Sequence, residues 1–90
     1  EVIKAKRKPE SAYKTENVIK TLNIQLTQYE VDFQSSIAES EEYKRLFTIA
    51  PEMKEILESH FLTARNNSNQ LLGKITAVKN VIEKLESSNQ

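Results

Sequence analysis

Apolar residues recur every three or four positions along the C-terminal part of the chain. From Met53 the repeating positions are Leu57, His60, Ala64, Asn67, Leu71, Ile75, Val78, Ile82 and Leu85. Residues at this spacing lie on one face of an α-helix, whereas a strand requires strict alternation. The pattern predicts one long helix over residues 51–86. Such a helix cannot bury its apolar face alone, so we expect another helix, from this chain or from a partner, to cover it.

A second pattern with steps of three and four precedes the first. Its positions are Ala12, Thr15, Ile19, Leu22, Leu26, Tyr29, Phe33 and Ser36. This spacing predicts a packed helix over residues 9–38. Ser40 followed by two acidic residues is typical of a helix N-terminus, so we expect a separate short helix over residues 41–49. Pro51 then predicts a break or a sharp kink at Ala50.

Residues 1–8 are rich in lysine and arginine and come directly before a proline. They are interpreted either as the end of an upstream helix or as a disordered basic tail. Because the chain begins at Glu1, we expect it to be a fragment of a longer protein.

The expected helices are roughly 40 Å long for residues 9–38 and roughly 50 Å for 51–86. If they pack antiparallel, the last helix is predicted to extend beyond the end of the first.

Length and composition favour a single small all-α domain. The chain has 90 residues, one glycine and two prolines, which are too few turn formers for a sheet protein. We therefore predict an antiparallel helical bundle, or a hairpin of two long helices with a short connecting helix. Its core is expected to be a seam between helices.

Charge and cysteine content limit the possible functions. The net charge is zero, with +3 over residues 1–20, −5 over 21–60 and +2 over 61–90. The acidic middle disfavours nucleic acid as a partner; it either guides a protein partner or forms a solvated surface. Cysteine is absent, and no apolar run approaches the roughly 20 residues that span a bilayer. These features predict a cytoplasmic protein without a membrane span.

The sequence contains no pattern that predicts an enzyme, a cofactor or a metal site. His60 is the single histidine and is interpreted as a half-buried structural residue. Glu41 and Glu42 are adjacent, so on a helix they point to different faces. Gly73 lies within the last helix, where two interpretations stay open: close approach of another helix, or a tolerated surface glycine.

The C-terminal half of the last helix has an unusually wide apolar face. This candidate partner-binding set is Leu71, Leu72, Ile75, Val78, Val81, Ile82 and Leu85. One interpretation is burial between two neighbours in a three-helix bundle. The other is a groove that takes an amphipathic helix of a client protein.

The segment from Leu62 to Ile75, with its run of asparagines before a leucine pair, resembles the long C-terminal helix of FlgN-type flagellar export chaperones. The similarity continues through the apolar residues Ala77, Val78, Val81, Ile82 and Leu85. The resemblance implies a cytoplasmic chaperone in flagellum biogenesis that binds helical regions of hook-associated client proteins. It also implies client contacts at Leu71, Leu72, Ile75, Val78 and Ile82. The alternative is a structural or adaptor module, a three-helix or coiled-coil assembly domain that binds a folded protein or itself.

Overall fold

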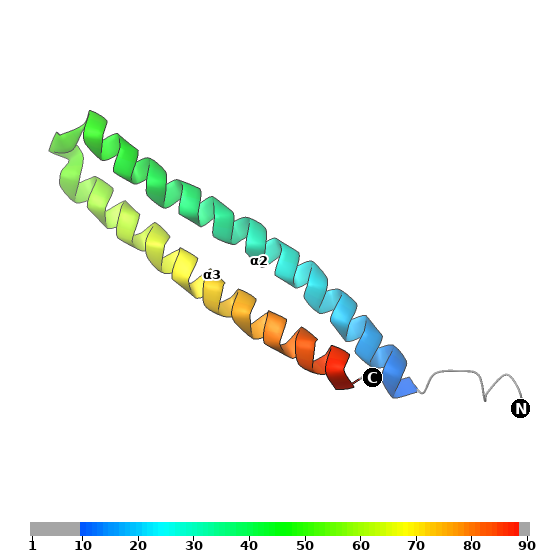
Figure 1. Ribbon diagram of the computed structural model, residues 1–90. Helices are drawn as coiled ribbons and strands as arrows, with labels where there is room; N and C mark the ends of the chain where they lie inside the picture. The colour runs from blue at the N-terminus through cyan, green and yellow to red at the C-terminus, as the bar shows by residue number, and fades with distance from the viewer. Residues whose placement is uncertain (1–9, 89–90) are drawn as a thin grey trace, which may run out of the picture.

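The computed structural model describes residues 10–88, with side chains from Lys14 onward, and shows two long antiparallel helices joined by a tight turn (Figure 1). Helix α2 spans Glu10–Ile49, a 3-10 turn η1 spans Pro51–Met53, and helix α3 spans Lys54–Ser88. No strand occurs within residues 10–88. The prediction of an all-α antiparallel hairpin is therefore confirmed. The basic segment 1–8 lies outside the described residues.

The chain reverses direction at Ala50 and Pro51. Ala50 leaves the helical region with φ −132° and ψ 68°, because a following proline disfavours the helical conformation. The amide of Ala50 still donates to the carbonyl of Leu46 (2.8 Å), and the amide of Met53 donates to the carbonyl of Ala50 (3.0 Å). The predicted break at Ala50 is confirmed, and it is the only interruption between residues 10 and 88.

The predicted end of the first helix at 38 and the separate short helix over 41–49 are wrong. Helix α2 continues through this region, which contains neither glycine nor proline. Ser40 does not cap a new helix: it is buried against α3, and its hydroxyl donates to the carbonyl of Ile37 (2.8 Å). The continuous helix of 40 residues is about 60 Å long, against about 52 Å for the 35 residues of α3. The expected overhang is thus reversed, and α2 is the longer helix.

Helix α3 also differs slightly from its predicted bounds of 51–86. The first three residues of the predicted range form the separate 3-10 turn η1, so α3 begins at Lys54, and its last residue is Ser88. The hydroxyl of Ser88 donates to the carbonyl of Lys84 (2.9 Å), which satisfies one of the last acceptors of the helix.

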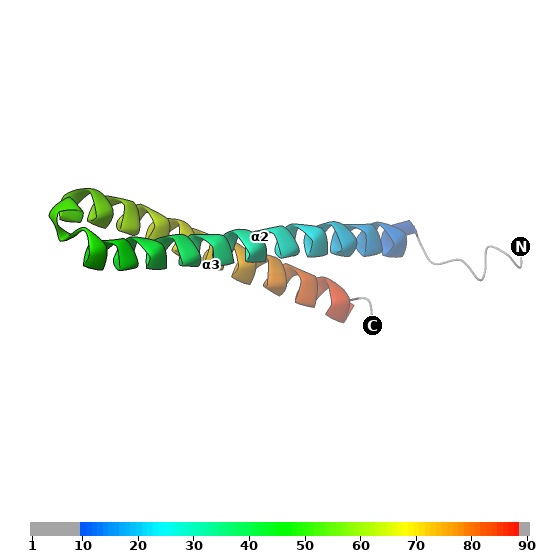
Figure 2. The same ribbon diagram turned by 90° about the horizontal axis from the view of Figure 1, so that it is seen from above.

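The two helices pack along one regular seam. In α2 the partly covered residues include every predicted position whose side chain is described, from Thr15 to Ser36. In α3 the seam residues are Leu57, Phe61, Ala64, Ser68, Leu71, Ile75, Val78, Ile82 and Leu85. Their steps alternate strictly between four and three, the spacing of a left-handed coiled coil. In agreement, α3 crosses obliquely beneath α2 when the hairpin is seen from above (Figure 2).

Two residues of the α3 pattern were assigned one position too early. His60 and Asn67 are exposed, and their neighbours Phe61 and Ser68 face α2 instead. The predicted series contained two consecutive steps of four, which suits a straight helix. The coiled helix keeps a strict seven-residue repeat, and at these two positions this shifts the seam by one residue toward the C-terminus.

The core is thin, and its most buried members are small. Ala64 is 1% exposed, and Ser68 and Ser40 are also buried. The hydroxyl of Ser68 donates to the carbonyl of Ala64 (3.1 Å), so its burial leaves no donor unpaired. Ile75 and Ile82 are the only large buried apolar side chains in the described part of the chain. Small side chains allow the helix axes to approach closely, but they bury little apolar surface.

Gly73 lies on the side of α3 that faces away from α2. A Cβ added there would meet no atom within 4 Å. Because nothing else in the described chain approaches this position, only the backbone entropy of glycine matters. We predict that Gly73→Ala raises the free energy of unfolding by about 1 kcal/mol, and Gly73→Ser by about half as much. Urea denaturation measures both; a loss of stability in Gly73→Ala would instead indicate a closely packed partner over this position.

Candidate partner-binding surfaces

The seven residues of the predicted partner-binding set do not share one surface. Five of them lie in the seam against α2: Ile75 and Ile82 are buried, and Leu71, Val78 and Leu85 are half-buried. Leu72 and Val81 project outward, with 49% and 48% of their surface exposed. The wide face therefore consists of five seam residues and two residues that flank the seam. Of the set, only these two are accessible to a partner without opening the hairpin.

Leu72 and Val81 lie on opposite flanks of the seam. Lys79, seven residues after Leu72, reaches across one flank to Glu30 (Nζ–Oε2 3.9 Å). Lys74, seven residues before Val81, lies on the other flank over the ring of Tyr29, at 5.6 Å from its centroid. Residues seven apart lie in one row along a coiled helix, so Leu72 lies in the row of Lys79 and Val81 in the row of Lys74. A single partner helix therefore cannot cover both Leu72 and Val81.

The side of α2 that faces away from α3 carries no charge over five turns. We define the outer face of α2 as the exposed residues Thr21, Ile24, Thr27, Gln28, Val31, Gln34, Ser35 and Ala38. Ile24 and Val31 are 68% and 55% exposed, and Ile24 is the most exposed large apolar residue among those described. Charge depletion with exposed apolar residues is typical of the centre of a protein interface.

The outward side of α3 is uncharged as well, but it differs in character. We define the outer face of α3 as Leu62, Thr63, Asn66, Asn69, Gln70, Gly73, Thr76, Ala77 and Asn80. Amides, hydroxyls and small residues dominate it, and Leu62 is its single large apolar residue. Acidic residues stand at both ends, Glu55 before it and Glu83 after it.

The turn of the hairpin bears a third candidate surface. Exposed apolar side chains cluster around it on both helices: Phe47, Ile49, Met53 and Ile56. A cleft of about 340 Å³ lies beside them, lined by Tyr43, Lys44, Phe47, Lys54, Leu57, Glu58 and Phe61. The cleft is mainly apolar, and the ammonium group of Lys44 lies over the ring of Phe61 at 5.3 Å from its centroid.

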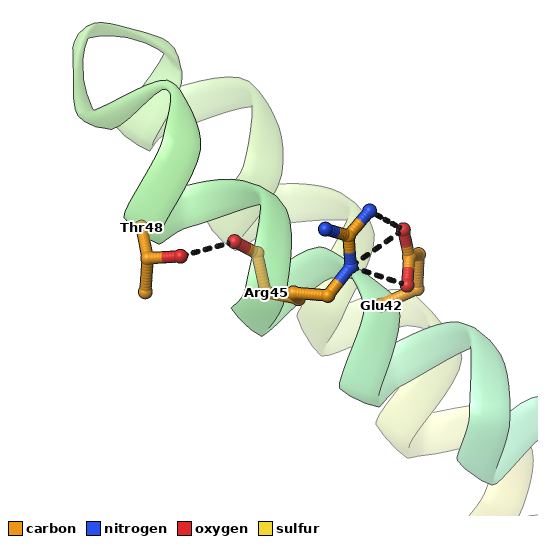
Figure 3. Close-up of polar contacts among 3 residues, drawn as sticks. All are labelled: Glu42, Arg45 and Thr48. Carbon is orange, nitrogen blue, oxygen red and sulfur yellow. Dashed lines mark hydrogen bonds and ion pairs between the residues drawn. The ribbon is translucent and has the colours of Figure 1, made fainter.

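Polar contacts near the turn stay within α2. The guanidinium group of Arg45 donates to the carboxylate of Glu42 (Nη2–Oε2 2.6 Å), and the hydroxyl of Thr48 donates to the carbonyl of Arg45 (Figure 3). The hydrogen bond from Arg45 lowers the pKa of Glu42 below its ordinary value. Likewise, the Tyr43 hydroxyl donates to Glu39 (2.7 Å), which raises the pKa of the tyrosine. These exposed contacts contribute little to stability.

His60 is exposed instead of half-buried, and its ring stacks on Tyr43 with the centroids 5.5 Å apart. Within residues 10–88, no group of three or more histidine, cysteine or acidic residues is arranged to hold a metal ion. Neither described helix is apolar enough to cross a bilayer.

Comparison with known families matches residues 20–88 to the VspR C-terminal bi-helical domain. The chain belongs to this family. The match to the bi-helical domain covers most of α2, the turn and all of α3 (Figure 1). It agrees with the hairpin seen in the structure. Comparison with curated proteins and with solved structures found no match.

Sequence reasoning missed the two uncharged outer faces and the apolar turn. A signal for the first was present: between Thr21 and Ala38 the only charged residues are Glu30 and Asp32, and both flank the seam. An outward face could be recognised only once the seam had been placed.

Proposed function

We propose that this chain is a non-catalytic protein-binding module whose helices pack against helices of another protein molecule. The observation that carries the proposal is the imbalance between buried and exposed apolar residues. In the described part of the chain, three hydrophobic residues are buried, whereas eleven large apolar residues are exposed. An isolated hairpin with so thin a core is marginally stable, and covering its exposed faces adds apolar burial.

The family supports a modular role. Its name places the bi-helical domain at the C-terminal end of VspR. A terminal pair of helices suits a module that brings its own protein together with a partner or with a second copy. The absence of a basic stripe from both outer faces favours protein over nucleic acid as the partner.

A more specific proposal is the chaperone function that the resemblance to FlgN-type proteins implies. A FlgN-type chaperone is expected to hold an amphipathic client helix on the residues from Leu71 to Leu85. Five of the seven pack against α2, so client binding there requires either that the hairpin open or that the client use Leu72 on one flank or Val81 on the other. The adaptor or assembly role requires no such opening, and we therefore favour it.

Thermal unfolding tests the proposed function, because a ligand that binds only the folded state raises the unfolding midpoint. We expect the midpoint to rise either with the concentration of the chain over about a hundredfold range, or on addition of a designed amphipathic helical peptide. A rise with the chain alone supports assembly, and a rise only with the peptide supports the chaperone role. A midpoint that is independent of both would refute helix binding.

A further inference from the structure

The outer face of α2, together with the charged residues at its two ends, forms three parallel rows of exposed residues. The central row is Ile24, Val31 and Ala38. One lateral row is Lys20, Thr27, Gln34 and Glu41, and the other is Thr21, Gln28, Ser35 and Glu42. Within each row the spacing is seven residues, so the members lie one above another along the helix. No other element of the described chain covers this side of α2 (Figure 1).

We propose that two copies of this chain associate through the outer face of α2, with the two α2 helices antiparallel and a two-fold axis at Val31. The inference rests on the proposed function and names its partner as a second copy. A two-fold axis perpendicular to the helices reverses their direction but lays each row against the same row of the other copy. Val31 then meets Val31, and Ile24 meets Ala38 of the other copy.

The charges at the ends of this face are complementary to themselves. In the antiparallel arrangement, Lys20 at one end of its row lies opposite Glu41 at the far end of the same row in the other copy. By symmetry this pair forms twice. Between the two pairs Thr27 faces Gln34, so no charge is buried without a partner. The carboxylate of Glu42, at the end of the other lateral row, is already held by Arg45.

Two of the polar side chains on this face already donate hydrogen bonds within their own helix. The hydroxyl of Thr27 donates to the carbonyl of Asn23 (3.1 Å), and the side-chain amide of Gln28 donates to Asp32 (2.9 Å). Each of these two groups therefore keeps one hydrogen-bond partner when it is covered, which reduces the desolvation cost of association. Ile24 and Val31 provide the apolar surface that drives it.

The charges at the ends of the outer face of α3 are not complementary to themselves. The corresponding lateral row there is Glu55, Leu62, Asn69, Thr76 and Glu83. The same two-fold operation about Asn69 would bring Glu55 opposite Glu83 of the other copy. Two acidic residues would then repel at each end, so α3 is the internal control for the argument.

The contact is small. From Lys20 to Glu41 it is about 32 Å long and one helix wide. Interfaces below about 1,200 Å² are characteristic of weak complexes. We therefore expect a dissociation constant on the order of 10 μM or higher, measurable by sedimentation equilibrium of the full chain.

A charge exchange tests the arrangement. Lys20→Glu and Glu41→Lys each turn two attractive pairs into repulsive ones, and each is expected to weaken association about tenfold. The double variant restores the pairs and should return to the parental affinity. Lys20 and Glu41 are about 32 Å apart within one helix, so restoration can report only a contact between copies. Circular dichroism controls for folding, and Glu83→Lys on α3 is expected not to weaken association.

Cysteine cross-linking gives a second, independent measurement, because the chain has no cysteine. Under mild oxidation, Val31→Cys should form a disulfide-linked dimer much faster than Asn66→Cys, an exposed position on the outer face of α3. Equal cross-linking rates would overturn the proposal, as would a double charge variant no tighter than the single ones. If the unfolding midpoint still rises with chain concentration or with the peptide, the proposed function stands and only this interface is wrong.

Discussion

Ile75→Asp is expected to unfold the hairpin. Ile75 is 6% exposed and is one of the two large apolar side chains buried in the described seam. Removing a buried isoleucine side chain costs about 2–5 kcal/mol, and a carboxylate without a partner in the same place adds several kcal/mol. The total stability of a small domain with so thin a core is on the order of 5 kcal/mol. Circular dichroism at 25 °C should therefore show loss of most of the helical signal.

Leu72→Asp is the matched control for this prediction. The two residues are three positions apart on α3 and the substitution introduces the same charge, but Leu72 projects away from the seam. We expect its free energy of unfolding to change by less than about 1 kcal/mol. If Ile75→Asp stayed folded while losing a partner, Ile75 would be a binding residue and the seam would be wrongly placed.

Ala64→Leu is expected to have the second-largest effect. Ala64 is 1% exposed and lies in the seam one turn before the buried Ser68, so the extra methyl and methine groups of a leucine have little space. Overpacking of this kind costs about 1–3 kcal/mol. The free energy of unfolding in urea measures it. Ala77→Leu on the outer face of α3 is the control, and we expect it to change stability by about 0.5 kcal/mol or less.

Equal stability of the two leucine variants would contradict the close approach at Ala64. It would mean that, in the third of the hairpin nearest the turn, the helices are far enough apart to accommodate a leucine. The seam would then be looser than the structure indicates, and its stability would depend on Ile75 and Ile82 alone.

The sequence was sufficient for the class of fold and for the turn. The heptad spacing from Thr15 to Ser36 identified the packed face of α2, and Pro51 located the reversal. Ser40 was misleading because a serine before two acidic residues has the same pattern at a helix start and inside a helix. Only its burial against α3, which is a tertiary contact, distinguishes the two.

The candidate site was less predictable, for a geometric reason. From Leu71 to Leu85 the sequence shows which residues are apolar but not which line of them the other helix covers. A shift of the seam by one residue decides whether Leu72 is core or surface. The outer face of α2 was overlooked for the same reason. Ile24 and Val31 can be recognised as exposed only when it is known which side of the helix packs against α3.

Two surfaces remain available once the outer face of α2 is assigned to a second copy. The apolar turn around Ile49 and Met53 and the polar outer face of α3 lie away from that contact. In an antiparallel pair of hairpins the two turns would lie at opposite ends, each free to bind a further protein. A module of this kind would bring two copies of its own protein together and present two identical binding sites.

Sedimentation equilibrium of the full chain tests the central claim most directly, namely that the exposed helix faces bind other helices. The monomer has a mass of 10.4 kDa. The account predicts an average mass that rises with concentration toward twice this value, or an increase on addition of the amphipathic peptide that equals the mass of the peptide. A mass that stays at 10.4 kDa at every concentration, with and without the peptide, would contradict it.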